Sequence, residues 1–288
     1  MANKVLEGDL VKRWRAFLGA SRLALAFVRN NMTETCYMCE AAPTSREHVP
    51  PKCLFPESKD INDQNFRENL ITVPSCDIHN SKKSKDDEFL MVSTAGILGN
   101  NSVGYQHKFG KVNRAIRRSS NRLLEKVFLK KQHYKVKIKN NEFIEVIWGT
   151  PDYKRLLSCY EHISYGIYYH HFGKRFVGEL KIIPSYFHKE DINARNFNQF
   201  IRDKTELELK GIEKFGTNNE IFYYQFTVED RIGLFLLKIC LYGGIDTYVS
   251  FIPEGVRLPF NLGMELINAG VHSIITLGDK EYEFNKEN

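Results

Sequence analysis

Two pairs of metal-binding residue types constrain the fold of this chain more than any other feature of its sequence. Cys36 and Cys39 lie in the segment CYMC, and Cys76 and His79 lie in CDIH, so two residues separate the members of each pair. Thiolates and imidazoles at this spacing are typical ligands of structural zinc, which is held tetrahedrally by four side chains. We therefore expect the four residues to meet at one Zn²⁺ ion and to clamp together the ends of the segment between them.

Two other interpretations of these residues are open. A redox-active Cys-x-x-Cys motif would account for Cys36 and Cys39, but it would leave Cys76 and His79 unexplained. Alternatively, the four residues are unrelated and simply buried, which the repeated spacing disfavours. The remaining cysteines are expected to pack as small apolar side chains; they are Cys53, Cys159 and Cys240.

The composition is that of a globular protein with a core of its own. Of the 288 residues, 42% are hydrophobic and 26% are charged, and the net charge is +6. The positive charge permits a nucleic-acid partner without requiring one. A chain of this length does not depend on disulfides, so the cysteines favour a reducing, cytoplasmic location. The apolar run AFLGASRLALAFV is too short to span a bilayer and contains Arg22, so we expect no membrane partner.

The pattern along the chain predicts an α+β protein with three parts. Residues 1–31 are expected to hold an amphipathic helix, from about residue 10 to residue 29, that packs on the rest. Residues 32–105 carry the paired ligands, prolines and polar loops, and residues 106–288 are expected to form a larger mixed α+β domain. Within that domain we predict helices over residues 108–131 and 153–171. Hairpins are predicted at HYKVKIKNNEFIEVIWG and SIITLGDKEYEF, and strands at FVGELKII, IFYYQFT and TYVSFI.

The segment between the two ligand pairs reads as strand, loop, strand and helix. The adjacent residues Glu47 and His48 come first, Asn69 precedes the short apolar segment LITV, and Asn80 directly follows His79. If zinc clamps the two ends, His48, Asn69 and Asn80 are brought together although they are far apart in the chain.

These residues, in this order, resemble the HNH endonucleases, also called ββα-metal nucleases. The resemblance covers about residues 34–90 and comprises C-x-x-C, E-H-x-x-P, N-L and C-x-x-H-N-x-x-K. It implies a ββα-metal module with a structural zinc ion. The chain differs from many relatives in having Glu47 where they have Asp and His79 where they have Cys, and Asn80 makes it an H-N-N variant.

The resemblance implies a role for each matching residue. His48 would be the general base that takes a proton from the attacking water, and Asn69 would hold the loop that bears His48. Glu47 and Asn80 would ligate a catalytic Mg²⁺ or Mn²⁺ ion. These residue types suit phosphodiester hydrolysis, because an imidazole can accept a proton near neutral pH and Mg²⁺ prefers oxygen ligands.

Basic residues near these positions are candidates for binding nucleic-acid phosphates, although a solvated surface is an equally open interpretation for each of them. Lys82, Lys83 and Lys85 follow Asn80, and Arg46 precedes the Glu-His pair. The predicted helix over 108–131 has many basic residues and one acidic residue, Glu125. Its arginines are Arg114, Arg117, Arg118 and Arg122.

Three hypotheses follow for the function. The first is a metal-dependent endonuclease that hydrolyses DNA, and by analogy with HNH modules fused to a second domain it would act in defence against foreign DNA. The second is a zinc-clamped module that binds nucleic acid without cutting it. The third is a regulatory nuclease that waits for a protein partner or a second copy, which the region after residue 105 would recognise.

Overall fold

The computed structural model describes residues 34–81, 83–97, 99–120, 122–137, 143–187, 191–258 and 260–286. The helix expected within residues 1–31 lies outside these ranges, and so does Lys82. In the described residues, helices and strands are mixed along the chain, in agreement with the predicted α+β class. None of the described helices combines the length and the apolar character that crossing a membrane would require.

The first part of the fold is a short hairpin followed by a helix. Strands β1 (Ser45–His48) and β2 (Thr72–Ser75) are antiparallel, and α2 (Asp77–Ser81) comes next. The Cys76 carbonyl accepts the backbone N–H groups of His79 and Asn80, which starts the helix one residue after the strand ends. The predicted order of strand, loop, strand and helix is therefore present. Two short 3₁₀ turns lie in the connecting loop, at Lys52–Leu54 and Ser58–Asp60.

The region that follows is a series of short helices. They are α3 (Ser84–Thr94), α4 (Ser102–His107), a π-helical turn (Lys108–Val112), α5 (Asn113–Arg118) and α6 (Arg122–Val127).

The prediction of one continuous helix over 108–131 is wrong at two points. Ser120 has a φ of 51°, in the left-handed region, which interrupts the helix. The Ser119 hydroxyl then accepts the N–H of Leu123 and caps the new helix. From Phe128 onward the chain is strand rather than helix.

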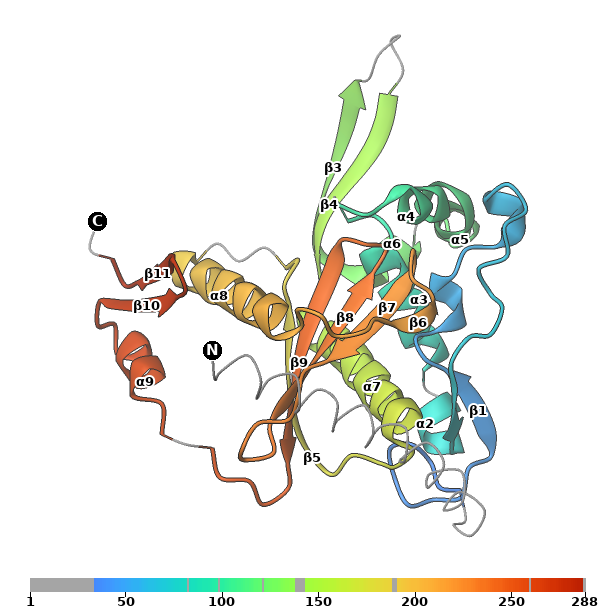
Figure 1. Ribbon diagram of the computed structural model, residues 1–288. Coiled ribbons are helices and arrows are strands. Elements are labelled where there is room, and N and C mark those ends of the chain that lie inside the picture. The colour runs from blue at the N-terminus through green and yellow to red at the C-terminus, as the bar shows by residue number, and fades with distance from the viewer. Residues whose placement is uncertain are drawn as a thin grey trace.

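A long hairpin projects from the body of the molecule (Figure 1). It consists of β3 (Phe128–Lys137) and β4 (Phe143–Pro151), which pair antiparallel from Phe128↔Pro151 to Lys137↔Phe143. The predicted hairpin is confirmed, and its first strand starts earlier than the sequence pattern indicated.

A five-stranded antiparallel sheet with one long helix forms the centre of the second half. The helix is α7 (Tyr153–Phe172), as predicted; the Asp152 side chain caps its first turn, and Gly173, with a φ of 69°, ends it. The strand order is β5-β9-β8-β7-β6. The strands are β5 (Gly178–Pro184), β6 (Phe215–Asn218), β7 (Phe222–Phe226), β8 (Phe235–Leu241) and β9 (Ile245–Pro253).

The last elements form an outlying layer. Helix α8 (Ile192–Glu208) packs against the hairpin of β10 (Ser273–Leu277) and β11 (Lys280–Phe284), and α9 (Leu262–Asn268) precedes that hairpin. The closing hairpin is confirmed with its turn at Gly278 and Asp279, whereas α8, α9, β6 and β8 were not predicted.

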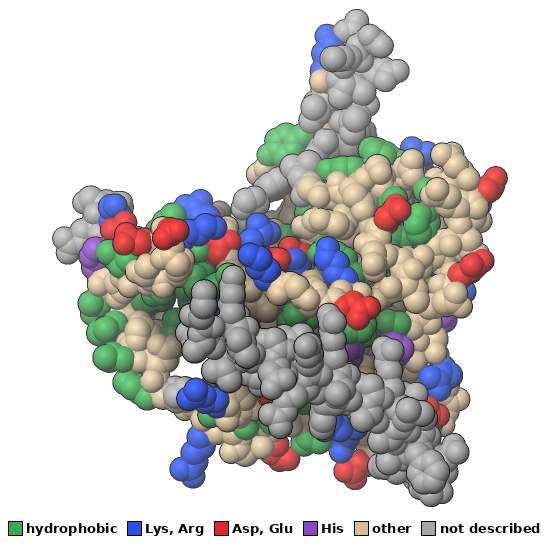
Figure 2. All heavy atoms as spheres, in the orientation of Figure 1, with side chains coloured by type: hydrophobic (Ala, Val, Ile, Leu, Met, Phe, Trp, Pro, Cys, Tyr) green, Lys and Arg blue, Asp and Glu red, His purple; other side chains and the backbone are tan. Residues whose placement is uncertain are grey.

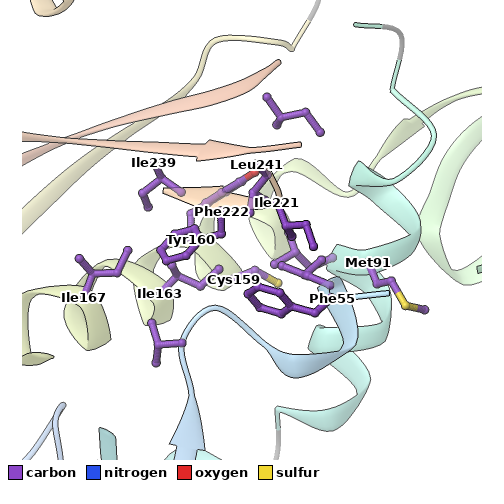
Figure 3. Packing of buried hydrophobic residues seen from close by; sticks show 14 of the residues in the cluster. Phe55, Met91, Cys159, Tyr160, Ile163, Ile167, Ile221, Phe222, Ile239 and Leu241 are labelled. Carbon is purple, nitrogen blue, oxygen red and sulfur yellow. The ribbon is translucent and has the colours of Figure 1, made fainter. Parts of the chain in front are cut away.

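One hydrophobic cluster joins the two halves of the chain. Tyr160 and Ile163 of α7 lie between sheet residues such as Ile239 and residues of the first half such as Phe55 (Figure 3). The core is thus continuous across residue 105, and the division proposed at that residue stays a prediction.

Candidate metal centre and the residues around it

The four predicted zinc ligands form one cluster, with all four ligand atoms within 4.8 Å of one another. Cys39 Sγ is 3.8 Å from Cys76 Sγ, and the His79 Nδ1 atom is 3.2, 3.4 and 3.6 Å from the sulfur atoms of Cys76, Cys36 and Cys39. Zinc–sulfur bonds of about 2.3 Å and zinc–nitrogen bonds of about 2.0 Å give tetrahedron edges of about 3.8 and 3.5 Å. These donors can therefore hold a metal ion such as zinc.

Local backbone contacts set the positions of the ligands. Cys36 N–H donates to the Ala41 carbonyl, which closes the loop bearing Cys36 and Cys39, and Tyr37 N–H donates to the Pro74 carbonyl of β2. The first ligand pair is thereby attached to the strand that leads into the second pair.

The chemistry of the second pair also suits a metal. Burial opposes ionisation of Cys76, but hydrogen bonds from the His79 N–H, the Cys39 and Cys36 thiols and the Ile78 N–H together lower the thiol pKa. Burial, with a contribution from nearby His162, lowers the pKa of His79. A thiolate and a neutral imidazole are the forms in which these residues bind zinc.

Glu47, expected to ligate a catalytic cation, is turned into the protein. Its side chain is 5% exposed and forms an ion pair with Lys83, which is 7% exposed. The Tyr37 hydroxyl lies 3.2 and 3.3 Å from the two carboxylate oxygens and donates to them. Within the described structure, therefore, the Glu47 carboxylate already has its charge neutralised and its oxygen atoms hydrogen-bonded.

Asp87 adds a second carboxylate beside this pair, and sequence reasoning missed it together with Tyr37. Burial raises the pKa of Asp87 to about 6, against the lowering effect of Lys83, and its Oδ1 atom is buried without a hydrogen-bond partner. The signal in the sequence was the spacing, because Asp87 follows Lys83 by one helical turn.

Asn80 lies on the same face of the hairpin as Glu47. Its Nδ2 group donates to the Ser45 hydroxyl at 2.7 Å, and Ser45 and Glu47 share one face because side chains alternate along a strand. Asn80 and Glu47 are thus brought to one side of β1, as common ligation of one ion would require.

His48 is the last residue of β1 and is half-buried. Burial, and next the positive charge of Lys52, lower the pKa of His48, so its neutral form is favoured at pH 7. Among the described residues, no hydrogen bond or ion pair engages its imidazole. By alternation His48 falls on the opposite face from Glu47, with Arg46.

The expected role of Asn69 is not seen in the described contacts. Asn69 is exposed with a φ of 52°, in the left-handed region that Asn tolerates. The loop after His48 is tied instead by a backbone hydrogen bond, from the Val49 N–H to the Ile71 carbonyl at 3.0 Å.

Two basic residues expected to contact phosphates have other partners. Lys83 is buried against Glu47, so it is not on an exposed phosphate-binding surface. Arg114 forms two hydrogen bonds with Asp60, of 2.6 and 2.7 Å, and a third with Glu57. In both cases a basic residue within a charged run is matched by carboxylates distant in sequence.

The other basic candidates are more accessible. Arg46 is exposed, and its guanidinium bridges Glu34 and Thr72. Arg118 and Arg122 donate to carbonyls of their own helical segment. The exposed basic candidates of the described chain are Arg46, Lys85, Arg117, Arg118 and Arg122.

Comparison with known proteins gave no match: no protein-family model, no curated protein and no solved structure matches this chain.

Proposed function

We propose that this chain is a metal-dependent endonuclease of the HNH type that hydrolyses phosphodiester bonds of DNA. The observation that carries the proposal is the hairpin and helix held at their ends by the Cys36, Cys39, Cys76 and His79 cluster. This arrangement presents a half-buried, neutral imidazole at the end of β1 and sets Glu47 and Asn80 on one face of the same hairpin.

In this mechanism His48 takes the proton from the attacking water. Its lowered pKa keeps the imidazole unprotonated, and therefore able to accept a proton, to lower pH than an ordinary histidine would be. The cluster of three cysteines and one histidine would bind zinc and hold β1 against α2.

Glu47 and Asn80 would hold the catalytic Mg²⁺ or Mn²⁺ ion, whose chemistry is to stabilise charge on the phosphate and the leaving oxygen. Lys83 must first move away from Glu47, because its ammonium group now neutralises that carboxylate. The catalytic cation is therefore part of the proposal and has to be tested separately from the zinc.

Nucleic acid would be held by the exposed basic residues near α5 and α6, namely Arg117, Arg118 and Arg122, together with Lys85. On the face shown in Figure 2, basic and acidic side chains are interspersed, so a contact of few phosphates is expected rather than a broad electrostatic track. Hydrophobic side chains gather over α9 and β10 on that face, and Leu262 of α9 and Ile274 of β10 are exposed. That patch supports a protein partner or a second copy at the C-terminal region.

A second candidate function, nucleic-acid binding without cleavage, is favoured by one observation. The ion pair between Lys83 and Glu47 occupies the carboxylate that the nuclease mechanism assigns to the catalytic cation. Under this alternative the zinc-clamped module is a scaffold, and the buried ion pair is structural.

The deciding experiment incubates zinc-loaded protein with supercoiled plasmid, single-stranded DNA or RNA, with Mg²⁺, Mn²⁺ or no added divalent ion. We expect wild-type protein to cut DNA only with added Mg²⁺ or Mn²⁺, and His48→Ala to be inactive with unchanged zinc content and melting temperature. The control is His272→Ala, which removes an exposed histidine paired with Glu283 in the outlying layer. DNA binding without cutting under every condition would favour the second candidate, and full activity of His48→Ala would remove His48 from the mechanism.

A further inference from the structure

One face of α7 packs against α3 and against the hairpin of β1 and β2. Arg155, Cys159, His162 and Gly166 are spaced by four, three and four residues, which places them in one row on a helix. Each of them contacts or approaches a residue of α3, of the metal cluster or of the chain directly after β1. Tyr160 and Ile163 of α7 lie outside this row and belong to the hydrophobic cluster that includes residues of the five-stranded sheet (Figure 3).

The first residue of the row, Arg155, contacts α3, the helix that follows the metal cluster. Arg155 Nε donates to Asp86 at 2.7 Å, and its guanidinium lies over the Phe89 ring at 4.4 Å. Cys159 Sγ lies 3.6 Å from the Asp86 carbonyl. One turn further, the His162 ring is 6.5 Å from that of His79, a cluster ligand.

The last residue of the row, Gly166, lies against Val49, which directly follows the proposed general base His48. A Cβ atom at Gly166 would lie 2.6 Å from Cγ2 and 3.0 Å from Cγ1 of Val49, closer than side chains approach in proteins. Val49 is 1% exposed, and its N–H is bonded to the Ile71 carbonyl. It therefore cannot move aside without disturbing β1, whose last residue is His48.

Glycine at position 166 calls for a specific reason. It lies inside a 20-residue helix, where Gly is about 1 kcal/mol less favourable than Ala. Its backbone is ordinary helix, so no special dihedral requires it. Glycine is required at this position because Val49 occupies the space that a Cβ atom would need.

We infer that Gly166 is a positioning residue: it lets α7 press directly on Val49, and this contact fixes the loop that carries His48. The region after residue 105 then sets the position of the proposed base, in addition to any role in recognition. The catalytic consequence rests on the proposed nuclease function, whereas the packing consequence does not.

The test enlarges the side chain at position 166 and then reduces the side chain at position 49. Gly166→Ala should lower kcat for plasmid cleavage by roughly tenfold or more with KM little changed, because small displacements of a catalytic group are costly. Val49→Ala removes both methyl groups that the new Cβ would meet. The double variant Gly166→Ala/Val49→Ala should therefore recover most of the kcat lost in Gly166→Ala.

The matched control is Gly263→Ala in α9. A Cβ there meets only the Asn261 side chain, at 3.4 Å, so the same substitution in a helix should leave kcat unchanged. Unchanged kcat in Gly166→Ala, or a double variant no better than Gly166→Ala, would overturn the inference.

A second measurement does not depend on activity. The imidazole NMR signal of His48, assigned with His48→Ala and recorded at one pH, should shift in Gly166→Ala and return toward its wild-type position in the double variant. If wild-type protein cuts nothing, the proposed function fails while this measurement still decides the inference. If Gly166→Ala does not fold, Val49→Ala alone should still move the His48 signal by loosening the same contact, and an unmoved signal would refute the inference.

Discussion

The buried ion pair between Lys83 and Glu47 leads to a quantitative prediction for Lys83→Met. Methionine keeps much of the length and volume of lysine but removes the ammonium group. Among the described residues, the Glu47 carboxylate, 5% exposed, would then keep only the Tyr37 hydroxyl as a hydrogen-bond partner.

Removing one partner of a buried ion pair typically costs about 3–5 kcal/mol, because the other charge is left unpaired away from water. The Tyr37 hydroxyl remains, so we expect the lower part of that range, about 3 kcal/mol. Single domains have unfolding free energies of about 5–15 kcal/mol, so the loss is a large fraction of the total. With a urea m-value of about 3 kcal/mol/M, the midpoint should fall by about 1 M.

The assay is urea unfolding of zinc-loaded wild type, Lys83→Met, Glu47→Gln and the double variant at pH 7. The double variant has no buried charge to leave unpaired, so it should be more stable than Lys83→Met. In addition, Mg²⁺ should raise the midpoint of Lys83→Met more than that of wild type, because Glu47 becomes available to a cation. A loss below about 1 kcal/mol in Lys83→Met, with no recovery in the double variant, would refute the reasoning.

Two further predictions concern the metal cluster and acid stability. Cys76→Ser, or removal of metal by a strong chelator, should abolish the cooperative thermal transition of the hairpin–helix module, since structural zinc contributes folding free energy directly; a normal melting curve with one zinc ion retained would contradict this. His107 is fully buried with its Nε2 against the Cys53 carbonyl, and burial lowers its pKa to about 4. The unfolded chain therefore binds more protons between about pH 6.5 and pH 4, so stability falls as the pH is lowered through this window, by about 3 kcal/mol in total. His107→Gln should flatten this dependence in urea titrations from pH 7 to pH 4.5, and an unchanged slope would exclude His107 as its source.

The features that the sequence predicted correctly are those set by local spacing. The Cys-x-x-Cys and Cys-x-x-His pairs need only a tight turn and a helix start to face one point, and the structure brings all four ligands together. The closing hairpin follows from Gly278 and Asp279 at its turn, and α7 follows from its apolar periodicity.

The features that the sequence did not predict depend on distant partners. Lys83 was expected at the surface because its neighbours are charged, but Glu47, 36 positions earlier, pairs with it inside the protein. Arg114 pairs with Asp60 across 54 residues. The helix breaks at Ser119 and Ser120 because Ser120 adopts a left-handed backbone conformation. The spacing of apolar residues does not predict such a break.

Likewise, the packing around His48 could not be predicted from the sequence. The contact between Val49 and Gly166 joins two residues with nothing in common in the sequence pattern. Only the packing of α7 against the loop relates them.

The hydrogen bond from the Tyr242 hydroxyl to the Leu54 carbonyl, at 2.6 Å and across 188 residues, has a consequence for synthesis on the ribosome. All four metal ligands are translated long before Tyr242, so zinc can be captured while most of the chain is still to be made. The stretch after His48 acquires its distant neighbours much later: Gly166 first, then Asn218, which holds the Phe66 carbonyl, and finally Tyr242. A nascent chain would thus be able to bind a metal early, whereas the segment beside His48 would lack its packing partners until translation is nearly complete.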